Sequence, residues 1–336
     1  TPALAGETAH LFKPGNAVRL RRNVNQDTPF PPEVPHSLNA PDGVLVYYYL
    51  GANPRGDISL DVLDASGHVV RHLSSAPITP VEEASHPPEP SFWLAPPTPM
   101  PTAIGTNRVN WDLRYDAPPA FSHSYGINAN PGLTPASPEG PLALPGTYTF
   151  RLTVDGKAYT QTATVTNDPR SPATLADLRA QHALQMQAYD GARAAWDGHE
   201  QAAAVREAVT KVAANAPAAV ADAAKAFAAK LDTVSGDLEG GGGRGGFFRG
   251  RGPSGPPNFK GVNGSLDRVL DALDPGDMAP NAPMRAGYTA ACTELRTAAS
   301  HWRTIVSKDL PAFNGLLKQN GLPAVAVPAG VTPPGC

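Results

Sequence analysis

The stretch that decides the fold class is residues 146–196, GTYTFRLTVDGKAYTQTATVTNDPRSPATLADLRAQHALQMQAYDGARAAW, in which the spacing of apolar residues changes. Up to residue 165, apolar side chains stand at every second position, which is the spacing of a half-buried strand. After residue 170 they recur every three or four positions, which is the spacing of one face of a helix. We therefore expect an α+β chain made of two segregated domains, with the strands first and the helices after them.

Strand-like runs follow one another through residues 44–168. These runs are rich in β-branched and aromatic residues, and Pro and Gly are frequent between them. The clearest hairpin signal is Asp155-Gly156, a dipeptide typical of two-residue turns. The pattern predicts an antiparallel, immunoglobulin-like β-sandwich over this region, with long loops at residues 75–105 and 116–145.

The helical spacing predicts an antiparallel helical bundle over residues 171–320. Ser171 is a good N-cap for its first helix, and Pro172 would stand at the first helical position. Pro311 is expected to end or kink the last long helix, because proline lacks the N–H that the helix requires. Asp309 would then cap a further short helix.

Three segments lack a clear period. Residues 1–43 are rich in proline and predict an extended segment, with one short strand near residues 17–22. Residues 236–261 are rich in glycine, and such a composition buries too little apolar surface to offset its ordering entropy, so a disordered loop is expected. Residues 321–336 form an apolar, proline-rich tail.

Composition excludes some classes of function. The 336 residues include 38 Pro and 32 Gly, and the formal net charge is −3. This balance gives no electrostatic case for binding DNA or an anionic membrane. The arginines within residues 243–252 mimic an RNA-binding Arg-Gly segment, but we expect a solvated insertion and no nucleic-acid partner. No run of 18 apolar residues occurs, so no membrane span is expected.

Six runs of the sequence are distinctive. They are YYYL (47–50), FWLAPP (92–97), NWDLRY (110–115), EGPLALPGTYTFRLTVDGKAYTQTATV (139–165), DPR (168–170) and KDLPAFNGLLKQNGLPAV (308–325). In this order they resemble the region after the β-propeller in a bacterial family labelled sialidase-like, BNR-repeat or sortilin-type glycosyl hydrolase. The resemblance implies an exported protein (periplasmic, cell-surface or secreted) whose propeller precedes this segment. It also implies an immunoglobulin-like sandwich of the flagellar-hook-cap type.

No catalytic residue is predicted. The hydrolase label of the family belongs to the propeller, and the Ser-x-Asp-x-Gly-x-Thr-Trp repeat of such propellers does not occur in the chain. Asp112 is expected to pair with Arg114 on the polar face of a strand, rather than to act as one of the two carboxylates that glycoside hydrolysis requires. The nine histidines are scattered, and no Cys-x-x-Cys or His-Glu-x-x-His motif occurs, so no metal and no cofactor are expected.

Trp93 and Arg114 are the candidate ligand-binding residues. Trp93 lies on the long loop 75–105, where an aromatic ring is placed to contact a sugar or another domain. The two residues would form a glycan site if they and the two long loops converge on one open surface. Trp111 and Tyr115 are instead predicted to be core, because strand aromatics dominate sandwich cores.

The two cysteines leave two interpretations open. In an oxidising compartment, a disulfide between Cys292 and Cys336 would tie the tail to the bundle. Otherwise both are free thiols, with Cys292 a small buried residue of a helix.

Three functions compete at this stage. The favoured one is a non-catalytic accessory or scaffolding module of a larger exported protein, whose partner is the β-propeller of the same parent protein. The second is a carbohydrate-binding module, with a glycan as the partner. The third is a cleft-lining part of a hydrolase whose catalytic propeller is absent from this chain.

Overall fold

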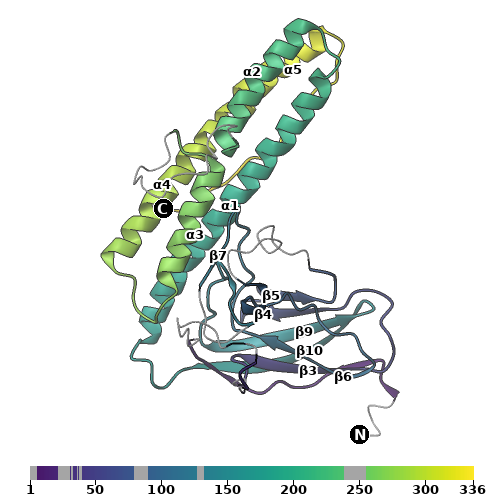
Figure 1. The fold of residues 1–336 in the computed structure, drawn as a ribbon, viewed down its shortest axis with the longest axis vertical. Coiled ribbons are helices and arrows are strands. Elements are labelled where there is room, and N and C mark those ends of the chain that lie inside the picture. The colour runs from purple at the N-terminus through teal and green to yellow at the C-terminus, as the bar shows by residue number, and fades with distance from the viewer. Residues whose placement is uncertain are drawn as a thin grey trace. The chain divides into compact units, whose positions relative to one another are not determined.

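The computed structural model describes residues 6–21, 31, 33–35, 37, 40–78, 90–126, 132–237 and 255–336. It has the α+β class expected from the change of spacing, with strands up to Asn167 and long helices from Leu175 onward (Figure 1). The chain divides into two compact units. The strand unit comprises Thr1–Ala117, Ser122–His182 and Asp274–Ala279, and the helical unit comprises Pro118–Phe121, Ala183–Leu273 and Pro280–Cys336.

The strands of the strand unit form three sheets. Their order is β1-β3-β6 in a three-stranded sheet, β2-β10-β9-β4-β5 in a five-stranded sheet, and β7-β8 in a two-stranded ribbon. The bounds are β1 (Ala9–Leu11), β2 (Ala17–Arg19), β3 (Val44–Leu50), β4 (Ser59–Leu63), β5 (Val69–Ser74), β6 (Gly105–Trp111), β7 (Ser124–Tyr125), β8 (Ala136–Ser137), β9 (Gly146–Val154) and β10 (Lys157–Asn167).

The expectation that every strand pairs antiparallel is wrong for one pair. β2 runs parallel to β10, with Ala17 opposite Val165 and Arg19 opposite Asn167. The five-stranded sheet is therefore mixed, and it curls like part of a barrel. No tight turn joins β2 to β10, so the turn chemistry that fixes an antiparallel hairpin does not act on this pair. The segment 1–43 also supplies β1 in addition to the short strand expected near residue 17.

The hairpin between β9 and β10 confirms the local prediction. Asp155 and Gly156 both have a left-handed backbone, with φ of 49° and 80°. This is the conformation that a two-residue turn of type I′ requires, and Asp-Gly adopts it readily. The turn sets the register, in which Phe150 lies opposite Gln161, and so directs the apolar face of β9 inward.

One hydrophobic core contains side chains from both large sheets. Trp111 of β6 is fully buried, and its ring packs edge-on against that of Tyr148, with 4.8 Å between the ring centroids. Tyr48 of β3 is buried, whereas its neighbour Tyr47 is 40% exposed, as strand alternation requires. Tyr115 is partly buried against the same core. The prediction that Trp111 is a core residue is confirmed.

The helices share a second core. Their bounds are α1 (Leu175–Ala213), α2 (Ala218–Ser235), α3 (Phe259–Leu273), α4 (Ala282–Thr304), a π-helical segment η4 (Ile305–Asp309) and α5 (Leu310–Gln319). The first turns of α1, up to His182, belong to the strand unit. Phe227, Leu266, Leu295, Trp302 and Phe313 are among the buried residues of this core. No described helix has the length and apolar character needed to cross a membrane.

The first helix begins later than Ser171. Thr174 caps α1, since its Oγ1 accepts from the backbone N of Asp177 at 3.2 Å and its own backbone N donates to Asp177 Oδ2 at 2.9 Å. This reciprocal pair is a capping box, and its Thr-x-x-Asp spacing is present in the sequence. The prediction of an N-cap at Ser171 is wrong, because the better cap lies three residues further on.

Pro311 does not end the last helix. The chain continues without a break from α4 through η4 into α5, where Pro311 stands near the start. A wide π turn accommodates the missing N–H and the ring of proline. Asp309 provides no side-chain cap, and its Oδ1 instead accepts from Lys230 Nζ at 2.6 Å.

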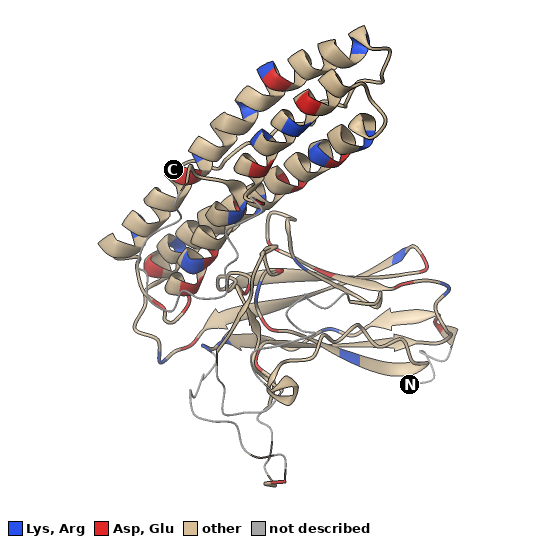
Figure 2. Cartoon of the chain, turned by 45° about the horizontal axis from the view of Figure 1, so that its top comes forward, with Lys and Arg blue, Asp and Glu red and all other residues tan. Residues whose placement is uncertain are grey.

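The predicted glycine-rich loop, residues 236–261, is largely outside the described residues, which resume at 255. Its last three residues belong to α3, which begins at Phe259. Charges of both signs are interspersed along the helices (Figure 2), consistent with the small net charge.

Candidate functional site: a buried arginine–aspartate cluster

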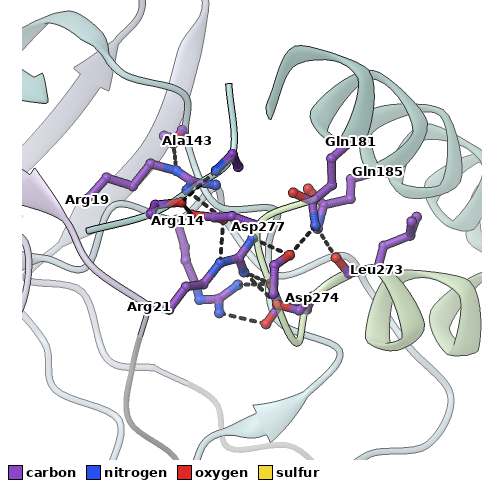
Figure 3. Close-up of polar contacts among 12 residues, drawn as sticks. Arg19, Arg21, Arg114, Ala143, Gln181, Gln185, Leu273, Asp274 and Asp277 are labelled. Atoms are coloured by element: carbon purple, nitrogen blue, oxygen red, sulfur yellow. Dashed lines mark hydrogen bonds and ion pairs between the residues drawn. The ribbon is translucent and has the colours of Figure 1, made fainter. Parts of the chain in front are cut away.

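Five charged side chains of the strand unit gather in one network, which we name the arginine cluster. They are Arg19, Arg21, Arg114, Asp274 and Asp277 (Figure 3). These residues come from parts of the chain that are far apart in sequence. Because buried ionic groups are rare in proteins, this cluster is the most informative polar feature of the unit.

The short strand β2 positions Arg19. Ala17 and Arg19 face inward, whereas Val18 between them is exposed. Arg19 therefore passes along the core and is only 2% exposed, and its Nε donates to the carbonyl of Ala143 at 2.9 Å. Arg21 follows two residues later and is partly buried in the same cluster.

A break in strand geometry positions Arg114. β6 ends at Trp111, and Leu113 has a left-handed backbone with φ of 64°. Arg114 then forms a β-bridge with Leu142, and its side chain turns inward and is 9% exposed. The expected ion pair with Asp112 on the polar face is therefore wrong, since Asp112 Oδ1 accepts from the backbone N of Arg114 instead.

The acceptors come from one turn, Asp274-Pro275-Gly276-Asp277, which follows α3. Arg114 binds the carboxylate of Asp274 through both terminal nitrogens, at 3.1 and 2.8 Å. Asp277 Oδ1 accepts from Arg19 Nη1 and from Arg21 Nε, both at 2.7 Å. Two backbone carbonyls of the turn also accept from Arg21, those of Asp274 and Gly276.

Gln181, a backbone carbonyl and Glu139 complete the network. Gln181 of α1 donates to the carbonyl of Gly276 at 2.6 Å. Arg114 Nη1 also donates to the carbonyl of Gly140 at 2.9 Å, and its Nε lies 3.5 Å from Glu139 Oε1. The five residues of the arginine cluster carry three positive and two negative charges, and Glu139 beside them brings the sum to zero.

The electrostatics follow from burial and pairing. Burial lowers the pKa of Arg19, even though Asp277 acts against this. For Arg114 burial is the largest single influence and works against the charge, but the hydrogen bond with Asp274 and the negative charges of Asp274, Glu139 and Asp112 together raise the pKa. Burial alone would raise the pKa of both aspartates, yet the hydrogen bonds from their arginine partners lower the pKa of Asp274 and of Asp277 below the usual 3.8.

This arrangement is suited to holding structure together rather than to proton transfer. Aspartates with lowered pKa values stay ionised at neutral pH and have no proton to donate as general acids. The guanidinium groups are engaged by carboxylates and carbonyls within the cluster, in the fork geometry that arginine favours.

Trp93 lies in a different environment. It ends the short helix η3 (Ser91–Trp93), and its carbonyl accepts from the backbone N of Gly132 and of Thr134, both at 3.1 Å. The two long loops thus meet through backbone hydrogen bonds. Trp93 is half-buried, while Phe92 and Leu133 are 48% and 47% exposed. Arg114 meets the loop 116–145 at a different place, where its Nη1 donates to the carbonyl of Gly140 and its side chain is held in the arginine cluster.

The two cysteines are joined. A disulfide connects Cys292 of α4 to Cys336, with the Cα atoms 5.8 Å apart. Of the two interpretations that the sequence left open, the structure has the bridged form.

Four members of the cluster were not predicted from the sequence: Arg19, Arg21, Asp274 and Asp277. A weak signal was present for Arg19, since alternation in Ala17-Val18-Arg19 places it on the same face as Ala17. The pairing of the Asp-Pro-Gly-Asp turn with residues some 250 positions earlier depends on tertiary structure alone.

Comparisons of the chain with family models, with curated proteins and with solved structures find no significant match. Within the described part of the chain, no group of three or more His, Cys, Asp or Glu side chains is arranged to hold a metal ion. The resemblance drawn from the sequence runs therefore stays a prediction.

Proposed function

We propose that the chain is a non-catalytic accessory module of a larger exported β-propeller protein, in which it acts as a scaffold. The observation that carries this proposal is the arginine cluster, whose three guanidinium groups are matched by Asp274 and Asp277 together with the neighbouring Glu139. A site for an anionic substrate would leave cationic donors unmatched and open to solvent. A matched and largely buried cluster instead stabilises the segments it joins.

The strand order supports an immunoglobulin-like sandwich as the architecture of the strand unit. The order β10-β9-β4-β5 corresponds to strands G-F-C-C′ of that fold, and β1-β3-β6 corresponds to A-B-E. The parallel strand β2 fits this scheme as the second half of a split first strand, which leaves one sheet and joins the other beside the last strand.

The disulfide supports an exported protein. Disulfides persist in oxidising compartments and are rare in the reducing cytosol. The Cys292–Cys336 bridge closes a loop of 44 residues within the helical unit. The propeller partner rests on the sequence resemblance alone.

The test uses the purified chain in two assays. Incubation with sialosides and aryl glycosides is expected to give no hydrolysis, and co-expression with the propeller of the parent protein is expected to give a stable complex. Turnover that disappears when a carboxylate is changed to an amide would overturn the proposal. So would a propeller that neither binds the chain nor gains thermal stability from it.

A second candidate is carbohydrate binding by the two long loops. It is favoured by the backbone hydrogen bonds that hold Trp93 against residues 132–134, because a preformed aromatic platform loses little entropy on binding a sugar. Binding on a glycan array that is lost with Trp93→Ala and with Phe92→Ala would support it. An array on which the chain binds no glycan would contradict it.

A further inference from the structure

Residues 322–336, which we name the strap, run back along the helical unit without forming a helix or strand (Figure 1). The strap sequence LPAVAVPAGVTPPGC contains four prolines and no charged residue. Proline-rich segments favour an extended polyproline conformation, whose backbone groups are left free for partners outside the segment. The strap therefore presents an extended backbone to the helices of the same chain.

Two side-chain amides of the helices hold the strap by its backbone. Asn314 Nδ2 donates to the carbonyl of Val325 at 2.9 Å, and the backbone N of Val325 donates to Asn314 Oδ1 at 2.8 Å. Gln201 pairs in the same way with Gly330, at 3.1 and 3.0 Å. Each amide thus binds both backbone groups of one residue. Such contacts recognise an extended peptide without regard to most of its side chains.

The positions of these contacts show that the strap is nearly fully extended. The helix from Tyr288 to Asn314 is about 39 Å long at 1.5 Å per residue. The strap from Val325 to Gly335 spans about 31–36 Å in an extended conformation. The hydroxyl of Tyr288 donates to the carbonyl of Gly335 at 2.8 Å, so the strap follows α4 and α5 in the opposite direction to the helices.

The helices also offer apolar contacts along this path. Val325 is 4% exposed and belongs to the core of the helical unit. Leu322 and Val331 are partly buried against the same core. The deeply buried side chain of Val325, whose backbone Asn314 holds, gives the groove a side-chain preference in addition to its backbone hydrogen bonds.

One covalent bond locks the strap in place. Cys292 lies buried on α4, whereas Cys336 is exposed. A thiolate of a dithiol reductant is able to attack the exposed sulfur, forming a mixed disulfide and releasing the thiolate of Cys292, which takes up a proton. The second thiol of the reductant then closes its own disulfide and frees Cys336, so that two thiols form on the chain as one dithiol is oxidised.

We propose that the helical unit carries a binding groove for an extended, uncharged, proline-rich peptide of another chain, and that the strap occupies this groove until its disulfide is reduced. With the bond intact, the strap cannot leave. With the bond reduced, it competes at an effective concentration of about millimolar, which a peptide partner is able to overcome. The proposal does not depend on the propeller partnership.

The experiment uses the full chain with the strap displaced by the double substitution Val325→Asp and Cys336→Ser. The carboxylate introduced in place of the valine side chain would be costly to bury, so the strap leaves the groove while Asn314, Gln201 and Tyr288 remain. A fluorescent peptide of residues 322–336 with Cys336→Ser is titrated and followed by anisotropy. We expect saturable binding to this variant and none to the oxidised wild-type chain.

Further substitutions in the displaced-strap background identify the groove. Asn314→Ala and Gln201→Ala are each expected to weaken peptide binding about fivefold or more, because each removes two hydrogen bonds. Asn320→Ala is the matched control, since this amide donates to the carbonyl of Leu316 in its own helix, and it should leave binding unchanged. Absence of binding by a variant whose helices are intact by circular dichroism would overturn the proposal.

Hydrogen exchange on the wild-type chain gives a second test that does not depend on the folding of the variant. On reduction, the amides of Val325 and Gly330 should exchange at least tenfold faster, while those of α4 keep their protection. Added peptide should then bind the reduced chain only. If the strap stays protected after reduction, or if the whole bundle loses protection together, the strap is a fixed part of the core and the proposal is wrong.

Discussion

Replacing Arg114 by alanine tests the arginine cluster most sharply, because the chain contains a matched control. Arg114 binds Asp274 through two nitrogens, and its side chain is only 9% exposed. Arg170 binds Asp168 through two nitrogens with similar distances, but its side chain is 79% exposed. The two substitutions remove the same chemical group and differ mainly in burial.

The expected magnitudes differ widely. Breaking a buried ion pair costs about 3–5 kcal/mol, because the remaining charge is left without its partner. Asp274 is 32% exposed and keeps a contact with Arg21 at 3.1 Å, so we expect a value near the lower end, about 3 kcal/mol. Arg170→Ala should cost far less than Arg114→Ala, because water and salt screen an exposed ion pair.

The assay is native-state hydrogen exchange of the amides of β9 and β10, which reports on the strand unit alone. The difference between Arg114→Ala and wild type should shrink below pH 4. Burial would raise the pKa of Asp274, but the hydrogen bonds and positive charges of Arg114 and Arg21 lower it in the folded state. The stabilisation is therefore present above the unfolded value of 3.8 and is lost as the pH falls through the folded value. Equal costs for Arg114→Ala and Arg170→Ala at pH 7 would refute the reasoning.

Three further predictions concern residues of the helices, their caps and the tail. Burial raises the pKa of Asp267 to about 7, above its unfolded value of 3.8, so the folded state loses stability as the pH rises between these two values. Asp267→Asn should therefore increase the free energy of unfolding by up to about 4 kcal/mol at pH 8 and leave it unchanged near pH 4, as measured by urea unfolding. Replacing Cys292 and Cys336 by serine should cost about 4 kcal/mol in the chain-entropy model, measured by thermal unfolding, and an unchanged melting temperature would contradict this. Thr174→Ala should cost about 1 kcal/mol through loss of the cap on α1. Asp177→Ala should also lower the stability, and no loss in either variant would count against the capping box.

Features set by neighbouring residues were predictable from the sequence. The β9–β10 hairpin follows from Asp155-Gly156, because only a few residues tolerate the left-handed backbone of this turn. The start of α1 was predicted too early because Ser171-Pro172 also satisfies the rules for a helix start, and local rules do not decide between two adequate caps.

Features set by distant contacts were not predictable. The left-handed backbone of Leu113 turns the side chain of Arg114 inward instead of outward. Alternation along a strand does not predict such a break in the strand. Arg21 and Asp277 form a hydrogen bond although 256 positions separate them. The parallel pairing of β2 with β10 likewise joins segments whose residues do not indicate that they pair. A single sequence without related sequences contains little information on such pairs.

The central claim is that the arginine cluster is closed upon itself and serves structure rather than a ligand. The most direct measurement follows the side-chain Nε–H signals of Arg19, Arg21 and Arg114 by nuclear magnetic resonance while acidic sugars and phosphate are titrated into the purified chain. The account predicts that these protons exchange slowly with water before any addition and that their signals do not move. Saturable shifts of the Arg114 signal on titration, or rapid exchange in the free chain, would contradict it.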